Sequence, residues 1–228
     1  MPLIKHPARS HLSARLPLAI CVLLLQSGCS LFGIRSAEEA PYSVLEEQGQ
    51  YQVRQYESLV VATTVVNSEF DEAGKQAFRR LFNYISGANK AAREIAMTAP
   101  VLATEDVTTE DAAANGEKIA MTAPVMREKQ DRGWRFSFVL PAGYTLANSP
   151  LPDDERVSLQ QIPARKVASL QYSGRWQQAR FEANSELLLQ WVSEQQMQPS
   201  SLPRVAGYDP PWTLPFLRRN EVLVDIKP

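Results

Sequence analysis

The sequence predicts an α+β fold in which a mixed or antiparallel sheet is flanked by two helices. Two observations support this prediction. Each half of the chain contains strand-like and helical segments in the order β, α, β, β, which indicates a duplicated unit. Helices do not alternate with single strands, as they would around a parallel sheet. Both halves are expected to form one domain over residues 46–228.

The first half is expected to contain a pair of strand segments, a helix and a further strand. Residues 51–66 alternate and are rich in Val and Thr, which is typical of strands. Ser68 is expected to cap a helix that runs until Gly87. Large apolar residues alternate along residues 134–140, which predicts a half-buried strand. The apolar residues at helical spacing are Phe70, Ala73, Ala77, Phe78, Leu81 and Ile85.

The second half repeats this order after a linker rich in Pro and Asp, residues 144–157. Strand segments are expected over residues 157–172, broken at Pro163, and two short strands over residues 205–208 and 220–226. A helix running to about residue 196 is expected between them. Its apolar side is marked by Trp176, Ala179, Ala183, Leu187, Trp191 and Val192.

An exact repeat lies inside the first half. The sequence Ile-Ala-Met-Thr-Ala-Pro-Val occupies residues 95–101 and again residues 119–125. The acidic, turn-rich residues 104–117 between the copies are expected to form an exposed loop between two strands. Packing of the repeat into a core is the favoured interpretation, and the alternative is that Met97 and Met121 line a ligand surface.

The N-terminus has the features of a bacterial lipoprotein signal. Three basic residues precede the apolar residues 16–25, which are too few to span a bilayer. Residues 26–29 (Gln-Ser-Gly-Cys) resemble a lipobox, so residues 1–28 are expected to be removed and Cys29 to be lipidated. An ordinary secretory signal or an uncleaved anchor is the alternative. Residues 29–45 are then a tether, and Ser30 favours the outer membrane of the cell envelope, facing the periplasm.

Both His and both Cys of the chain lie within the first 29 residues. The mature body therefore contains no His and no free thiol. This excludes Cys–His and Ser–His–Asp catalysis, His or Cys zinc sites and His-ligated haem, and no structural metal is expected. Removing residues 1–28 changes the formal net charge from −1 to −4, which argues against nucleic-acid binding.

Several separated motifs resemble the SOUL haem-binding family. They are the paired Met-Thr-Ala-Pro-Val segments, Tyr-Ser-Gly-Arg-Trp at residues 172–176, Ala-Gly-Tyr-Asp-Pro-Pro at residues 206–211, and Arg-Arg-Asn-Glu-Val at residues 218–222. The resemblance extends from about Pro41 to the C-terminus. It implies a duplicated β-α-β-β unit with pseudo-twofold symmetry and a distorted, barrel-like sheet, similar to the gyrase-inhibitor-like fold.

The resemblance also implies non-covalent binding of haem or another porphyrin. The expected site is a shallow apolar surface between the first helix and the loop before the last strand. In the helix its contacts are Phe78, Leu81, Phe82 and Ile85. In the loop they are Trp212, Leu214, Phe216 and Leu217, followed by Arg218 or Arg219 for a propionate.

A porphyrin is a flat apolar disc with two carboxylates, so it requires an apolar platform with cations at its rim. Phe78 and Phe82 are four residues apart and share a helical face, with Arg79 and Arg80 between them. Packing in the core is the competing interpretation for Phe78 and Leu81. For Trp212 and Phe216 it is covering the end of the sheet. Because the mature chain has no His, only Tyr84, Tyr208 or a Met remains to ligate iron, and weak binding that tolerates metal-free porphyrin is expected.

Two other classes of function remain open. A small-molecule hydrolase of the gyrase-inhibitor-like fold would use a buried glutamate with an aromatic hydroxyl, for which Glu221 and Tyr208 are candidates. The competing interpretation is that Glu221 is a charge at a strand edge that answers Arg218 or Arg219. An envelope protein that binds another protein would use the acidic loop at residues 104–117, although a charged loop is usually only solvated. The protein partner in that case is unknown.

Overall fold

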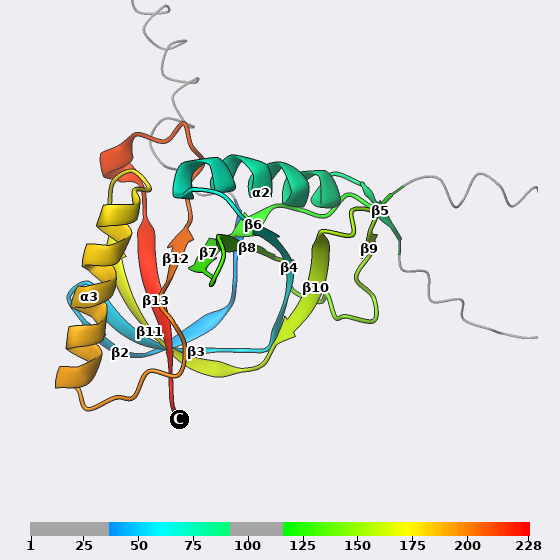
Figure 1. Ribbon diagram of the computed structural model, residues 1–228. Helices are drawn as coiled ribbons and strands as arrows, with labels where there is room; N and C mark the ends of the chain where they lie inside the picture. Colours follow the sequence, from blue (N-terminus) through cyan, green and yellow to red (C-terminus); the bar gives the residue numbers. More distant parts are fainter. Residues whose placement is uncertain (1–36, 92–115) are drawn as a thin grey trace, which may run out of the picture.

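The computed structural model describes residues 37–91 and 116–228, and most of their strands form one curled sheet (Figure 1). This sheet has nine antiparallel strands in the order β10-β4-β8-β7-β12-β13-β11-β3-β2. Its strands are β2 (Tyr42–Gln48), β3 (Tyr51–Tyr56), β4 (Leu59–Val66), β7 (Val125–Lys129), β8 (Trp134–Val139), β10 (Val157–Ile162), β11 (Arg165–Tyr172), β12 (Arg204–Gly207) and β13 (Asn220–Ile226). The described helices are α2 (Phe70–Ile85), α3 (Gln178–Glu194) and the short 3₁₀ helix η1 (Pro215–Leu217). The α+β prediction is confirmed.

Two short strand pairs accompany this sheet. Strand β1 (Glu38–Glu39) runs parallel to β6 (Thr122–Ala123), and β5 (Asn89–Lys90) runs antiparallel to β9 (Leu151–Pro152). Strands β1 and β2 thus lie within residues 38–48 and pair with other strands. The sequence, by contrast, predicts a tether over residues 29–45. The first copy of the exact repeat and nearly all of the loop at residues 104–117 lie outside the described residues.

The two halves of the chain are interlocked in the sheet. Strands β4, β8 and β7 lie side by side, followed by β12, β13 and β11 of the second half, so the halves meet where β7 pairs with β12. Strand β3 belongs to the first half by sequence but pairs with β11, and β10 belongs to the second half but pairs with β4. The first half therefore contributes β3 and β2 to the side of the second half, and the second half contributes β10 to the side of the first.

Helix α2 forms largely as its periodicity predicts. The buried residues Phe70, Ala73, Ala77, Leu81, Tyr84 and Ile85 lie on one side of it. Asp71 and Glu72 in the first turn interact favourably with the helix dipole. The predicted capping by Ser68 is wrong, because the helix is capped at Glu69 without a side-chain hydrogen bond. The Ser68 hydroxyl is buried and has no hydrogen-bond partner among the described residues.

Helix α3 lies where it was predicted, and Trp191 and Val192 are buried as expected, but its N-terminal part packs with a different side. Ala179, Ala183 and Leu187 are exposed. The buried residues are Phe181, Ser185, Leu188, Trp191 and Val192, a series with helical spacing that includes the bulky Phe181. Leu187 and Leu188 are adjacent, so an apolar series at helical spacing can be drawn through either of them. The prediction used Leu187, which is exposed, and the core contains Leu188.

The two faces of the sheet are both covered. On one face, side chains of both helices form a large core with Val205, Val222 and Val224. On the other face, a smaller cluster includes Met126, Val139 and Leu223. This second cluster explains why β8 is buried on both sides over Phe136–Val139 and not half-buried as predicted. Neither helix within the described ranges is long and apolar enough to cross a membrane.

A buried ionic network lies on the face opposite the helices. The Glu221 carboxylate is fully buried and accepts hydrogen bonds from both terminal nitrogens of Arg54, at 2.7 and 2.9 Å. The Tyr208 hydroxyl donates to it at 2.7 Å and Arg219 Nε at 2.9 Å. Arg219 also pairs with Glu39, at 3.0 Å. Burial raises the pKa of Glu221, but hydrogen bonding and charge from Arg54, with the charge of Arg219, hold it below its usual value.

We expect Glu221→Gln to destabilise the protein by about 3–5 kcal/mol in urea unfolding at pH 7, because the buried Arg54 guanidinium loses its counter-charge and Arg219 keeps only Glu39. The pKa of Glu221 in the folded state lies below its value of about 4.3 in the unfolded chain. The stabilisation by the ionised carboxylate is therefore complete above about pH 4.3, and it is lost as the pH falls through the folded-state pKa. The difference from wild type therefore shrinks below about pH 4. The exposed Glu182→Gln on α3 is the matched control, and equal stability of the two variants at pH 7 would contradict the expectation.

Candidate functional site

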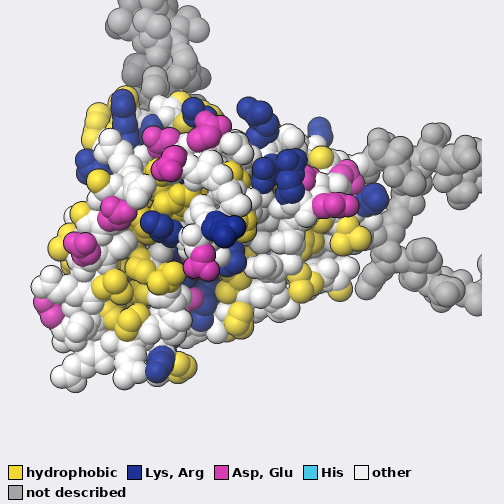
Figure 2. All heavy atoms as spheres, viewed as in Figure 1, with side chains coloured by type: hydrophobic (Ala, Val, Ile, Leu, Met, Phe, Trp, Pro, Cys, Tyr) yellow, Lys and Arg dark blue, Asp and Glu magenta, His cyan; other side chains and the backbone are white. Residues whose placement is uncertain are grey.

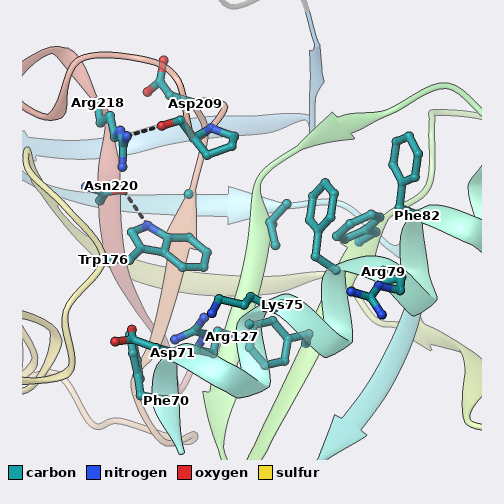
Figure 3. A pocket seen from close by; sticks show the side chains of 17 residues that line it. Phe70, Asp71, Lys75, Arg79, Phe82, Arg127, Trp176, Asp209, Arg218 and Asn220 are labelled. Carbon is teal, nitrogen blue, oxygen red and sulfur yellow. Dashed lines mark hydrogen bonds between the residues drawn. The ribbon is translucent and has the colours of Figure 1, made fainter.

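A pocket of about 640 Å³ lies between α2 and the segment that joins β12 to β13 (Figure 3). It opens on the face of the sheet that carries the helices. Figure 2 shows apolar side chains near the start of α2, bordered by acidic and basic side chains. The pocket lies at the place that was expected to bind a porphyrin, between the first helix and the last loop.

The floor of the pocket is built by β7 and β8. Side chains alternate along a strand, so Val125 and Arg127 point to the same face of β7. Their partners across the strand pair are Phe138 and Phe136. All four residues line the pocket, which gives it an aromatic floor that contains one guanidinium.

The wall formed by α2 is aromatic. Phe78 and Phe82 are four residues apart, and their rings stack with centroids 5.7 Å apart and an interplanar angle of 13°. The Phe78 ring also meets the edge of Phe138 at 5.5 Å. Phe78 and Phe82 are 43% and 47% exposed. Both line the pocket, so Phe78 is not a core residue.

The two other helical residues expected at the site, Leu81 and Ile85, lie in the core. Leu81 and Ile85 are 0% and 5% exposed. They lie on the side of α2 that packs against the sheet, next to the side that faces the pocket. Ile85 contributes to a smaller cavity at the end of the helix, together with Phe82 and Met121.

The opposite wall is held by Trp176. Its indole nitrogen donates to the side-chain oxygen of Asn220 at 2.7 Å, and the Asn220 side chain donates to the carbonyl of Gly174 at 2.9 Å. A Cβ atom at Gly207 would lie 2.1 Å from the Trp176 ring. Glycine at position 207 therefore lets the indole lie directly on the backbone of β12, where it faces the pocket (Figure 3).

Arg127 is the unusual member of this site. It is only 4% exposed, and its guanidinium carbon lies 3.8 Å from the ring centroid of Phe70, 4.5 Å from Phe136 and 5.0 Å from Trp176. Its Nε and Nη1 atoms are buried and find no hydrogen-bond partner among the described residues. Burial lowers the pKa of Arg127 to about 10, partly opposed by the charge of Asp71. The group remains a cation at neutral pH.

Charged side chains surround the mouth of the pocket. Asp71, Lys75 and Arg79 lie on α2, and Asp209 and Arg218 lie across from them (Figure 3). Arg218 also fixes its own loop, because its Nε donates to the carbonyl of Thr213 at 2.7 Å and its Nη2 donates to that of Pro211.

The remaining loop residues expected at the site do not line this pocket. Trp212 and Phe216 are 66% and 70% exposed, Leu214 is exposed and Leu217 is half-buried. Arg219 lies on the opposite face of the sheet, in the network of Glu221, because adjacent strand residues face opposite sides. Of the two arginines considered for a propionate, only Arg218 borders the pocket.

The candidate hydrolase pair and the candidate iron ligands also lie elsewhere. Tyr208 and Glu221 contact each other as expected, but Glu221 is ion-paired on the other face, so it is no strand-edge charge. Burial, followed by the charge of Glu221, raises the pKa of Tyr208 well above its usual value. The Tyr84 hydroxyl is buried and donates to the carbonyl of Pro150 at 2.9 Å. Among the described residues no group of three or more His, Cys, Asp or Glu could hold a metal ion.

Arg127, Trp176, Phe136 and Phe138 were not identified as site residues from the sequence. The alternation along β7 and β8 carried part of the signal, since it places Arg127 and both phenylalanines on the helix side of the sheet. The pairing of the two strands, which brings the cation next to the rings, is a property of the fold. Trp176 precedes its helix and was assigned to the helical stripe.

Known proteins resemble the chain over the same region. A profile of the SOUL heme-binding proteins matches residues 37–225. Heme-binding protein 1 of Xenopus tropicalis is 28% identical over 196 residues, covering 85% of this chain and 93% of the frog protein. Heme-binding protein 1 of Mus musculus is 29% identical over 199 residues, covering 85% and 94%.

Among solved structures, the C-terminal domain of EcmrR superposes with a TM-score of 0.52 at 13% sequence identity. The match covers 78% of this chain and 97% of that domain, and it concerns the fold alone. The family profile spans nearly all of the described residues and includes every element of the pocket. The chain therefore belongs to the SOUL heme-binding protein family.

Proposed function

We propose that the protein binds haem or another tetrapyrrole, non-covalently, in the pocket between α2 and the β12–β13 segment. The observation that carries this proposal is an apolar aromatic pocket with cations within it and at its mouth, in a chain of this family. A volume of about 640 Å³ is typical of small-molecule sites. The stacked Phe78 and Phe82 provide a platform for the disc.

The cations suit the carboxylates of such a ligand. Lys75, Arg79 and Arg218 border the mouth, where a guanidinium or ammonium group pairs with a propionate. Trp212 and Phe216 extend the apolar surface beyond the pocket, and we propose that they contact the part of the disc that projects from it. Leu217, next to them, would have a supporting role.

Iron ligation is not expected to contribute to binding. Residues 29–228 contain no His, and Tyr84 and Tyr208 donate their hydroxyls to other groups away from the pocket. Met121 lines the smaller cavity at the end of α2 and not this pocket. We therefore propose a site that recognises the disc and its carboxylates and binds weakly. Relatives named as heme-binding proteins, and a Glu221 carboxylate held by two guanidiniums, both favour a binding protein over a hydrolase.

We further propose that the protein is exported and lipid-anchored through Cys29, in the outer membrane of a bacterial cell envelope. The support is the basic and apolar N-terminal sequence followed by Gln-Ser-Gly-Cys. A protein partner that docks on the loop at residues 104–117 remains the alternative role, and its chemistry is not indicated by that sequence.

Haemin titration tests the proposed site. Wild type is expected to give a saturable shift of the Soret band. Phe82→Ala should weaken binding about tenfold, since the lost aromatic contact corresponds to about 1.4 kcal/mol. Leu187→Ala, an exposed apolar residue on α3, is the matched control and should bind as wild type does. A wild type without a saturable shift would refute the proposal.

Removal of iron tests the absence of axial ligation. Metal-free protoporphyrin IX is expected to bind within about threefold of haemin, a difference below 1 kcal/mol. Competition between the two porphyrins, followed by absorbance, measures this ratio. A preference for haemin of more than about tenfold would show that a ligand to iron contributes.

Lipidation is tested by metabolic labelling with an alkyne fatty acid in a Gram-negative host. Wild type is expected to be labelled and to sediment with membranes, whereas Cys29→Ser should lose the label. Cys21→Ser is the matched control, because Cys21 lies inside the apolar segment of the signal and should leave labelling intact. Label retained by Cys29→Ser would place the modification elsewhere.

A further inference from the structure

The Arg127 guanidinium is buried, and two of its three nitrogens have no hydrogen-bond acceptor among the described residues. Guanidinium carries five N–H donors, and an ionised group buried without partners costs several kcal/mol. The rings of Phe70, Phe136 and Trp176 offset part of this cost for Arg127 through cation–π contacts. They accept no conventional hydrogen bond, and Nε and Nη1 have no partner among the described residues.

The position of this cation is supported on several sides. Position 74 carries no side chain, and a Cβ atom there would lie 2.5 Å from Arg127 Nη2. Gly74 thus leaves the space under α2 that the guanidinium occupies. Arg127 lines the pocket, between the side chains of α2 and Trp176 (Figure 3). The exposed Asp71 influences it by charge, but no ion pair joins the two residues.

We propose that Arg127 binds a carboxylate of the ligand at the floor of the pocket, so that the pocket selects flat apolar acids over their neutral analogues. This inference rests on the proposed function and adds to it the orientation of the ligand. One carboxylate reaches the guanidinium at the floor and pairs with it away from water. The second carboxylate, on the neighbouring pyrrole of the same edge, is then left for a cation at the mouth.

The chemistry of the pair favours the floor over the mouth. Arginine presents a planar fork that matches a carboxylate with two parallel hydrogen bonds, and the surrounding rings restrict its orientation. The Lys75 side chain, by contrast, is 76% exposed, so an ion pair with it is weakened by water and salt. A ligand carboxylate at Arg127 would also supply the acceptor that its buried nitrogens lack.

The test compares mesoporphyrin IX with its dimethyl ester, which has the same ring but no carboxylate. Binding is followed by quenching of tryptophan fluorescence, with wild type and Arg127→Met. Wild type is expected to prefer the acid at least about tenfold, which corresponds to one charge-assisted pair. In Arg127→Met this preference should fall at least about threefold, to the part that the cations at the mouth maintain, while affinity for the ester changes less than about threefold.

Two further variants separate charge from packing. Arg132→Met removes a cation from the exposed turn between β7 and β8, far along the strand from the pocket, and should leave the preference unchanged. Arg127→Lys keeps a charge without the planar fork and should retain an intermediate preference. Thermal unfolding of each variant checks that it is folded, and the comparison of acid with ester in wild type needs no variant.

The outcomes distinguish this inference from the proposed function. If wild type binds both porphyrins with equal affinity, the protein is a tetrapyrrole binder and the role of Arg127 is refuted. If Arg127→Met is folded and keeps the preference for the acid, another cation holds the carboxylate. If it loses both ligands equally, Arg127 only supports the pocket wall. If wild type binds neither porphyrin, the proposed function itself fails.

Discussion

The alternation of side chains in the central strands β7, β12 and β13 is the constraint on which the rest of the structure depends. In β13 it sends Asn220 towards the pocket and Glu221 into the ionic network, two environments separated only by the thickness of the sheet. In β7 it sends Arg127 to the aromatic floor and Met126 to the second cluster. A shift of one residue in β13 would place the ionised Glu221 on the side of the pocket, and a shift in β7 would exchange Arg127 with Met126.

The pocket lies where the two halves of the chain meet in the sheet. Its floor includes Val125, which pairs with Gly207 across the junction of β7 and β12. One wall comes from α2 in the first half. The other comes from Trp176, which precedes α3, and from β12 and the segment that follows it. The aromatic residues of α2 in the first half and the glycine under Trp176 in the second half thus border the same pocket.

Elements of the fold were more predictable than the contacts of the site. The helices and most strands follow from periodicity and from breaks such as Pro163, because these signals are local. The packing side of α3 was predicted at Trp191 and Val192 but not in its N-terminal part, where the neighbouring Leu187 and Leu188 fit two different apolar sides. Phe78 and Phe82 were predicted as ligand contacts and line the pocket, but Leu81 and Ile85, from the same stripe, face the core. Arg127 needed strand pairing that no local pattern contains.

The exchange of β3 and β10 between the halves has a kinetic consequence. Arg54 in β3 pairs with Glu221 in β13, 167 positions away, so the buried ionic network cannot form before the last strand exists. Contacts of such separation slow folding, since chain entropy is lost before they form. The edges of β4 and β11 stay unpaired in a nascent chain and can associate with other strands. A chain with this topology has most need of protection while it is being made.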